Sequence, residues 1–549
     1  MRLIIEVLAS KRTLYSLIIT WLVVIIFSNL VLPPVDDDKF YLAPAMGLLY
    51  KSQLGAYVGD DFVPIFSTLP GFFFFQGLFL GLMSFLHVQL NIYTYRLFLM
   101  VSILVLILLS LYLIFLIHRR RGNYHIIHSN IFMIVLGITP FSQYCWNLRP
   151  EILGIVFILA GLIFYRYWDL SQKSSNVLYY LSALFLGISM TVHPNVTIYA
   201  SFLVLVVMLL SFKKDHISRP FLFGCVSSVP LFVIAVWFLK HYPESLQEFM
   251  FNINKKTTMS IWNTSFQMVV GDALMLAKGN SKMIKVFWAI FAFPLLALLL
   301  TTVIMFIKNG KEIIKKDRFN IIIISIFFLG VIRLFIPEGM TSHNYIKFTA
   351  FFTALALPIA LVLPINRIFK MPAQVVANKK VNLYKTLIMF MFIGIIALHS
   401  IIHTIKFTFS SEQYHYAPKV YSAVTSQLES GDTLFLKKDG LVPTFIDLYK
   451  AKYKGNPEIK IYHTYSFSVV KSMKPFMKSK IQSLCHDKTV WGVYKSSLEF
   501  DRDNMRLSTK LYSVGGIAYM NMDFKIKKII YEDKRCLFFR PSMIEYKEL

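Results

Sequence analysis

Long apolar runs separated by short polar segments make up most of this chain. The runs approach the roughly 20 residues that a membrane-spanning helix needs, and the shorter ones reach it when flanking residues are included. The pattern predicts a polytopic α-helical membrane protein with about eleven transmembrane helices. We place the spans at Leu14–Leu32, Tyr95–Ile117, Ile126–Phe141, Ile152–Trp168, Val177–Val192, Val196–Phe212, Phe221–Leu239, Val286–Ile307, Ile321–Ile336, Phe348–Leu363 and Leu387–Ile402.

One further apolar stretch, Leu69–Leu86, decides the topology. If it is not a span, five segments that are rich in Lys and Arg face the cytoplasm, in agreement with the positive-inside rule. Counting it as a span would turn four of these five segments outward. The segments are Arg2–Arg12, His118–Arg121, Lys213–Arg219, Lys308–Arg318 and Arg367–Lys385. We therefore predict a cytoplasmic N-terminus, an extracytoplasmic C-terminus, and a helix over Leu69–Leu86 that lies on or dips into the outer leaflet.

This topology predicts two domains. Residues 1–404 form a membrane module with two long outer loops, 33–96 and 240–285. Residues 405–549 form an extracytoplasmic α/β domain, because amphipathic stretches there alternate with runs of β-branched and aromatic residues. The β-like runs are DTLFLKK, EIKIYHTY, TVWGVYKS and IKKIIYEDKRCLFFR.

The composition supports the membrane class and limits the partners. The chain has 549 residues, of which 56% are hydrophobic and only 16% charged, whereas about a quarter is usual in a soluble protein. Its net charge of +27 falls largely in short clusters between apolar runs, with no nucleic-acid-binding module, so we expect no nucleic-acid partner. The four cysteines, Cys145, Cys225, Cys485 and Cys536, lack the spacing of metal ligands. Whether Cys485 and Cys536 form a disulfide stays open.

The predicted topology places the unusual polar groups on the outer face. Each has a plain structural interpretation: a solvated turn for the three aspartates, an ion pair at a helix start for Arg149 and Glu151, and a turn residue for His193. Arg333 is harder to explain in this way, because it lies inside an apolar run and needs an anionic partner or a snorkelling route. Together the groups predict an acidic and basic cavity at the outer leaflet. They are Asp36–Tyr41 (DDDKFY), Arg149, Glu151, His193, Arg333, Glu338, His343, Tyr345 and Lys347.

This combination suits group transfer from a lipid phosphate. The cations would hold the phosphate, and an aspartate would accept the proton of an acceptor hydroxyl as general base. The donor is a phosphate diester, whose phosphate is already a good leaving group, so the reaction needs no protein acid. Paired carboxylates in the triplet Asp36, Asp37 and Asp38 could alternatively hold a divalent metal.

The motifs resemble the C-type (GT-C) glycosyltransferases that use polyprenyl-phosphate-linked sugars, a group that includes protein O-mannosyltransferases and the lipid A aminoarabinose transferase. In that family an acidic pair opens the first outer loop, followed by Tyr, Ala and Leu at helical spacing. Asp37-Asp38, Tyr41, Ala45 and Leu48 match it. Further matches are the stretch TLPGFFFFQGLF, Arg96, Glu151 and SHNYIKF. The family's HPP-type motif is present only as Val63-Pro64 and Leu69-Pro70, which leaves open how the loop frames the acceptor.

The resemblance implies an inverting transfer of a sugar from a polyprenyl-phosphate donor to a hydroxyl of a glycan, lipid or protein on the outer face. Asp37 would be the base, Asp38 or Asp36 would orient it or support a metal, and Glu151 would be the second carboxylate. Arg333, Lys347 and His343 would bind the lipid phosphate. The expected substrate-binding residues are Asp36, Tyr41, Arg96, Arg149, Arg333, His343, Tyr345 and Lys347. No cofactor is expected beyond that metal, and we expect a bacterial inner membrane with a periplasmic active site.

Two other functions compete with this interpretation. O-antigen polymerases and ligases also use lipid-linked sugars, but they carry key arginines in a large late outer loop. The loop Lys240–Lys285 contains no Arg. A transporter or flippase would instead show ionisable residues in mid-span and broken helices in paired halves.

Overall fold

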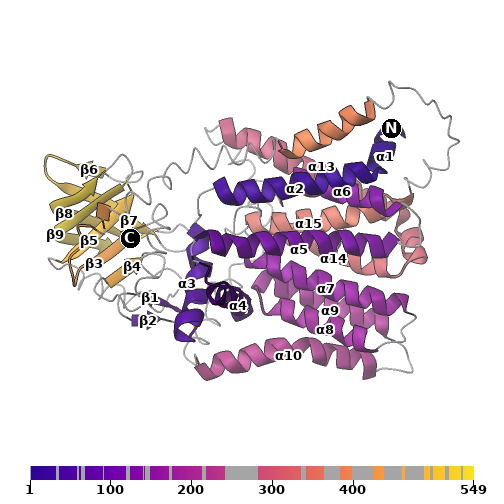
Figure 1. Ribbon diagram of the computed structural model, residues 1–549, viewed down its shortest axis with the longest axis horizontal. Coiled ribbons are helices and arrows are strands. Elements are labelled where there is room, and N and C mark those ends of the chain that lie inside the picture. The colour runs from indigo at the N-terminus through magenta and orange to yellow at the C-terminus, as the bar shows by residue number, and fades with distance from the viewer. Residues whose placement is uncertain are drawn as a thin grey trace. The chain divides into compact units, whose positions relative to one another are not determined.

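The computed structural model consists of two compact units (Figure 1). Unit 1 contains Met1–Val31, Leu99–Ala235 and Lys255–Ile405, and unit 2 contains Leu32–Phe98, Val236–Asn254 and Lys406–Leu549. The structure describes residues 2–31, 36–58, 61–63, 69–88, 90, 92–118, 124–139, 141, 149–171, 176–212, 218–241, 282–335, 342–363, 384–397, 423–424, 426–437, 460–463, 488–494, 499–512, 518–532 and 536–548.

A helix lies over each of the predicted apolar runs. Besides the short α1 (Arg2–Leu8), these helices are α2 (Lys11–Val31), α5 (Ile92–His118), α6 (Tyr124–Ile138), α7 (Pro150–Leu170), α8 (Asn176–Met190), α9 (Pro194–Ser211), α10 (Ser218–His241), α13 (Lys282–Lys316), α14 (Phe319–Phe335), α15 (Ser342–Ala360) and Tyr384–Ala397. Five of the described helices, α2, α5, α7, α9 and α10, are long and apolar enough to cross a membrane. The chain is therefore an integral membrane protein built of helices, and the count of eleven spans stays a prediction.

The directions of the helices in unit 1 follow from contacts at their ends. Asn130 Nδ2, near the start of α6, donates to Leu8 O at 2.6 Å, and Trp21 Nε1 of α2 donates to Met133 O at 3.1 Å, so α2 and α6 run parallel. His118, at the end of α5, stacks on His128 of α6 with ring centroids 3.9 Å apart. Hence α2 and α5 are antiparallel. That Leu69–Leu86 adds no crossing of the membrane stays a prediction.

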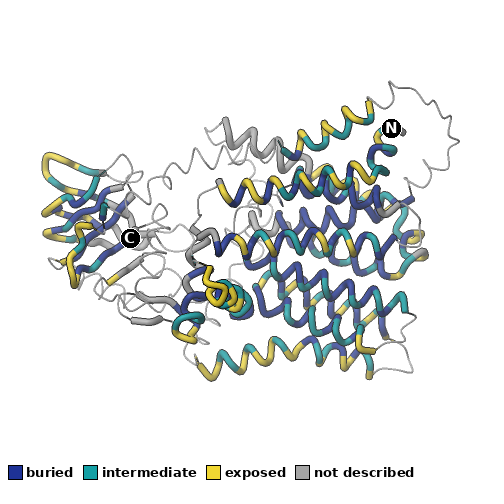
Figure 2. Tube along the Cα trace, in the orientation of Figure 1, coloured by how far each residue is buried: buried dark blue, intermediate teal, exposed yellow. Residues whose placement is uncertain are grey.

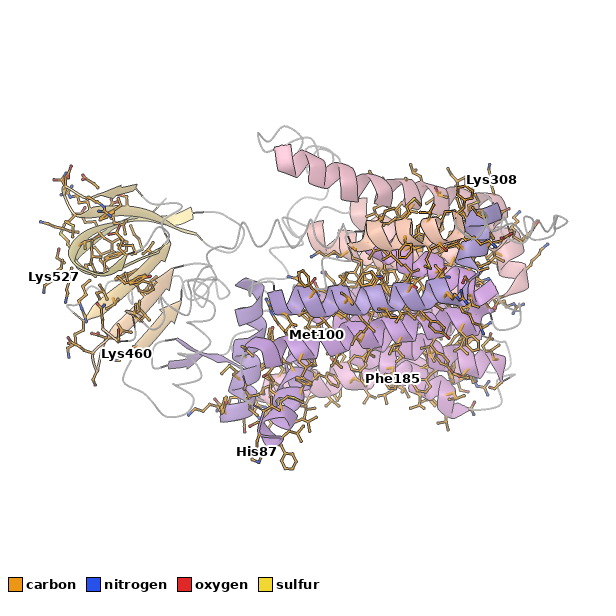
Figure 3. The ribbon with its side chains drawn as sticks, turned by 45° about the horizontal axis from the view of Figure 1, so that its top comes forward. His87, Met100, Phe185, Lys308, Lys460 and Lys527 are labelled. Carbon is orange, nitrogen blue, oxygen red and sulfur yellow. The ribbon has the colours of Figure 1, made fainter. Side chains whose placement is uncertain are left out.

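Two further contacts give the directions of helices α7, α14 and α15. Arg166, near the end of α7, is paired with Asp317, just before α14. Thr349 Oγ1 of α15 donates to Gly330 O of α14 at 2.9 Å, which joins the end of α14 to the start of α15. Helices α7, α9 and α15 begin at the same end of unit 1, and we call this end the "site end". Lys308, labelled in Figure 3, lies on α13 toward the opposite end.

Burial in unit 1 is graded from helix to helix (Figure 2). Helix α7 is buried along most of its length, with Ile155, Ile158 and Leu162 inaccessible. Helix α10 instead exposes large apolar side chains, among them Phe221 and Phe232. Such a surface is stable only where hydrocarbon rather than water covers it, which fits a helix that faces lipid.

Unit 2 contains α3 (Asp36–Lys51), β1 (Ala56–Val58), β2 (Asp61–Val63), α4 (Pro70–Phe85) and the start of α5. Helix α3 packs on α4, where Gly77 lies against Leu48 and the carbonyl oxygen of Ala45. Helix α4 packs on α5, because Phe72 and Phe79 both contact the ring of Phe98, at centroid distances of 6.1 and 5.3 Å. The predicted helix over Leu69–Leu86 is confirmed, and its place in the outer leaflet stays a prediction.

Unit 2 also contains a seven-stranded sheet of order β4-β3-β5-β9-β8-β7-β6, in which β3 runs parallel to β4 and β5 and the other pairs are antiparallel. Lys460 of β4 and Lys527 of β8 are labelled in Figure 3. Rings of Phe435, Trp491 and Phe524 form a continuous core between the strands. The strands are β3 (Thr433–Lys437), β4 (Lys460–His463), β5 (Thr489–Tyr494), β6 (Glu499–Asp501), β7 (Arg506–Tyr512), β8 (Ala518–Glu532) and β9 (Cys536–Glu548).

Strands lie in all four of the predicted β-like runs of this region. The helical part of the predicted α/β domain falls mostly outside the described residues. The domain boundary at residue 405 and the extracytoplasmic position of the domain stay predictions.

Candidate functional site

The start of α7 holds a buried ion pair. Pro150 occupies the first helical position, where its missing N–H costs nothing, and Arg149 before it is extended. Arg149 donates from Nε to Oε2 of Glu151 at 3.2 Å and from Nη2 to Oε1 at 3.0 Å. The Glu151 side chain is fully buried, and its place in the first turn is favourable for a carboxylate because of the helix dipole. The ion pair considered from the sequence is therefore present.

His193 connects this pair to α9. It is the N-cap of α9, and its Nδ1 accepts the backbone N–H of Asn195 at 3.2 Å. Its Nε2 lies 3.6 Å from Oε1 of Glu151. The helices approach closely here, because a Cβ added to Gly154 of α7 would lie 2.6 Å from both methyl carbons of Val196 of α9. His193 is thus a turn residue, as predicted, whose ring also faces the carboxylate.

Arg333 and Lys347 lie at the same end of unit 1. Arg333 is in the last turn of α14, and Lys347 is near the start of α15; their exposed fractions are only 7% and 6%. Tyr199 of α9 stacks on Phe348 with ring centroids 5.1 Å apart and an interplanar angle of 7°. This contact ties α15 to α9 about two turns from His193.

The site end of unit 1 therefore gathers three cations and one carboxylate in a mostly buried setting. Among the described side chains at this end, Arg149, Arg333 and Lys347 are cations and Glu151 is an anion. Guanidinium and ammonium groups are the side chains that bind phosphates and carboxylates most strongly. Such an end is suited to an anionic ligand.

The predicted acidic motif opens α3 in unit 2. Asp36, Asp37 and Asp38 form its first turn, where the helix dipole favours carboxylates, and Tyr41 follows in the next turn. Nothing in the described residues places the side chains of these four residues. Ala45 and Leu48 contact α4, so the spacing shared with the family has a packing reason. Arg96, early in α5, is buried in the same unit.

Several predicted residues fall outside what the structure describes. His343 and Tyr345 lie in the first turn of α15, but their side chains are outside the described set, as are Glu338 and most of the loop 240–285. Cys225 is a free, exposed cysteine, whereas Cys145, Cys485 and the side chain of Cys536 are not described. Within the described ranges no cluster of three His, Cys, Asp or Glu could hold a metal, so a metal at Asp36–Asp38 stays a prediction.

The distribution of buried charge bears on the transporter interpretation. Among the described helices, the buried ionic side chains Arg96, Glu151, Arg166, Arg333 and Lys347 all lie within about two turns of a helix end. A transport path predicts ionisable residues in mid-span, beside interrupted helices. That pattern is not present in the part of the chain that the structure describes.

Two features of the site were not predicted from the sequence. It recognised His193 but not its approach to Glu151, and it did not consider Tyr199. The signal for His193 is the His-Pro pair, since a polar residue before Pro is typical of a helix start, and an N-cap side chain stands at the helix end. No sequence signal distinguishes Tyr199 from other aromatic residues of the core.

Comparisons with known proteins place the fold. No protein-family model matches the chain, and no curated protein does. Among solved structures, ArnT from Cupriavidus metallidurans in the apo state matches with a TM-score of 0.57 and 12% identity, over 95% of this chain and 96% of that one. The same protein bound to undecaprenyl phosphate gives a TM-score of 0.55 at 11% identity, over 96% and 98%. The apo oligosaccharyltransferase of Archaeoglobus fulgidus gives 0.49 at 12%, over 88% and 69%.

The fold is therefore similar to that of ArnT over nearly the whole of both chains, which fits the resemblance that the sequence motifs indicated.

Proposed function

We propose that this protein is a membrane glycosyltransferase that moves a sugar from a polyprenyl-phosphate donor to an acceptor hydroxyl on the outer face of the membrane. The observation that carries the proposal is the group of largely buried ionic side chains at the site end of unit 1, Arg149, Glu151, Arg333 and Lys347, in a fold similar to that of ArnT. A structure of ArnT has been solved with undecaprenyl phosphate bound.

The proposed reaction is a single displacement with inversion. Asp37 accepts the proton of the acceptor hydroxyl, whose oxygen attacks the anomeric carbon of the sugar. The bond between that carbon and the phosphate oxygen breaks, and polyprenyl phosphate leaves with the electron pair. Asp38 or Asp36 orients the base or supports a divalent metal, which would supply further positive charge toward the phosphate.

The cations have a separate role in this proposal. Arg333, Lys347 and His343 bind the phosphate, which strengthens as a hydrogen-bond acceptor when its charge grows in the transition state. Glu151 is the second carboxylate of the site, held by Arg149. Tyr41, Arg96 and Tyr345 complete the substrate-binding set. A location in a bacterial inner membrane, with the site facing the periplasm, belongs to the same proposal.

A transfer assay in membranes tests it. Undecaprenyl-phosphate-linked aminoarabinose and mannose would be supplied as donors, and release of free undecaprenyl phosphate would be measured. Asp37→Asn keeps the size of the side chain but removes the base, so turnover should fall by orders of magnitude in protein that is expressed and folded. Glu6→Gln, in the exposed pair with Lys385, is a matched charge control that should retain turnover. Wild-type turnover in Asp37→Asn would refute Asp37 as the base.

A further inference from the structure

We propose that His193 is a positioning residue that holds the Arg149–Glu151 pair in place for binding of the donor phosphate. The inference rests on the proposed function and adds a residue to its site. Both ring nitrogens of His193 have a defined neighbour: Nδ1 accepts from the backbone N–H of Asn195, and Nε2 faces Oε1 of Glu151 at 3.6 Å.

The hydrogen bond at the N-cap determines which tautomer the His193 ring adopts. A nitrogen that accepts a hydrogen bond carries no proton, so in the neutral imidazole the proton is on Nε2. This N–H is directed at the carboxylate of Glu151. At 3.6 Å the contact is a charge–dipole attraction rather than a formed hydrogen bond.

The surrounding packing explains how this contact can act on Arg149. Glu151 already accepts from Nε and Nη2 of Arg149, so the carboxylate lies between the two side chains. Gly154 and Val196 bring the starts of α7 and α9 together beneath it. Without the Nε2–H of His193, the charge of Glu151 is less compensated and the pair can shift, which makes the site end less positive toward a phosphate.

Two substitutions separate positioning from capping. His193→Asn keeps an acceptor where Nδ1 stands and so preserves the N-cap, but its side chain is too short to reach Glu151. His193→Gln places an N–H donor as many bonds from the backbone as Nε2, but is a poor cap. Thr197→Val is the structural control in the same turn, because the Thr197 hydroxyl donates to the carbonyls of Met190 and His193 and touches nothing in the ion pair.

The experiment measures binding of undecaprenyl phosphate and of undecaprenol to the full-length protein in detergent, together with thermal unfolding. The difference between the two affinities isolates the contribution of the phosphate. We expect His193→Asn to lower this preference about 10- to 100-fold at an unchanged unfolding temperature, the size of effect that a displaced binding group produces. His193→Gln should retain most of the preference while unfolding earlier, and Thr197→Val should unfold earlier with the preference intact.

Each outcome bears on one proposal. If wild type does not prefer undecaprenyl phosphate over undecaprenol, the proposed function loses its phosphate site. If wild type shows the preference and His193→Asn keeps it in full, His193 is only a cap and the inference is wrong. A loss of preference in Thr197→Val equal to that in His193→Asn would also overturn it, since any disturbance of the turn would then suffice.

Discussion

Arg166 of α7 holds Asp317 through two parallel hydrogen bonds, from Nη1 to Oδ1 at 3.0 Å and from Nη2 to Oδ2 at 2.5 Å. Asp317 also accepts the backbone N–H of Phe319 and so caps α14. Arg166 further contacts Asp169 at 3.0 Å and lies over the ring of Phe319. One buried guanidinium thus joins two helices at the end of unit 1 opposite the site end.

Asp317→Asn should destabilise the protein by about 3 kcal/mol, because removing the main partner of a buried guanidinium leaves its charge compensated only by the partly exposed Asp169. Asparagine is still a good N-cap, so the change isolates the ion pair from the cap. Thermal unfolding in detergent measures the effect. Arg502→Met, which breaks the exposed pair with Glu532, is the control and should cost less than about 1 kcal/mol. Equal losses in the two variants would show that the Arg166 pair contributes no more than a surface contact.

Gly187→Ala should impair folding strongly. A Cβ at Gly187 of α8 would lie 2.2 Å from the backbone oxygen of Ser227 in α10, and no side-chain rotation can relieve a clash with backbone. Gly310 of α13 has no atom within 4 Å of such a Cβ, so Gly310→Ala should be neutral or stabilise by up to about 1 kcal/mol through helix propensity. Folded yield after detergent extraction and the unfolding temperature check both. A well-folded Gly187→Ala protein would contradict the close contact of α8 and α10.

Gly154→Ala should be partly rescued by a second substitution. Its Cβ would meet the methyl carbons of Val196 at 2.6 Å, an overpacking that typically costs about 1–3 kcal/mol. Val196→Ala removes those methyl groups, so the double variant should be more stable than additivity of the single changes predicts. Unfolding temperatures of the four proteins in this cycle provide the measurement. Strict additivity would mean that α7 and α9 do not touch there.

Arg333→Gln and Lys347→Gln should each weaken binding of undecaprenyl phosphate about tenfold, the effect of losing one charge-assisted hydrogen bond. Both side chains are buried at the site end. Lys311→Gln is the matched control. Lys311 is exposed and lies near the last residue of α13, at the end of unit 1 opposite the site end, so this change should leave the affinity unchanged. Loss of affinity in all three variants would indicate a diffuse effect of net charge, and loss in none would remove the two residues from the site.

The pKa of Asp501 should be lower than its ordinary value of 3.8, chiefly because the side chain of Asn504 donates a hydrogen bond to its carboxylate at 2.8 Å. A pKa that is lower in the folded protein means that these bonds stabilise the turn above the unfolded pKa, and that the stabilisation is lost as the pH falls through the folded pKa. Asn504→Ala should raise the pKa of Asp501. Carbon NMR of labelled aspartate, assigned with Asp501→Asn, follows the titration, and an unchanged pKa would refute the role of Asn504.

Local pattern was sufficient for most elements of the fold. Helices lie over the apolar runs because a buried or lipid-facing backbone must satisfy its own hydrogen bonds, and a continuous apolar segment can do so only as a helix. The strands of the sheet lie in the runs of β-branched and aromatic residues because such side chains pack well in a sheet, and in β8 alternate side chains such as Met522 and Phe524 are buried. The ends of helices were less certain, and α13 extends well past its apolar run into the charged segment that ends at Lys316.

For the candidate site, the sequence identified residues, whereas the contacts between them came only from the structure. Sequence alone identified Arg149, Glu151, Arg333 and Lys347, because an ionisable group beside an apolar run is conspicuous wherever the chain later places it. It also predicts the orientation of the chain in the membrane, since Lys and Arg between apolar runs indicate which loops face the cytoplasm. Only the tertiary structure decided that Glu151 is enclosed by Arg149 and His193, and that Tyr199 ties α9 to α15. These contacts join residues from helices far apart in sequence, and their geometry depends on how closely helices can approach, as at Gly154 and Val196, which no local pattern encodes.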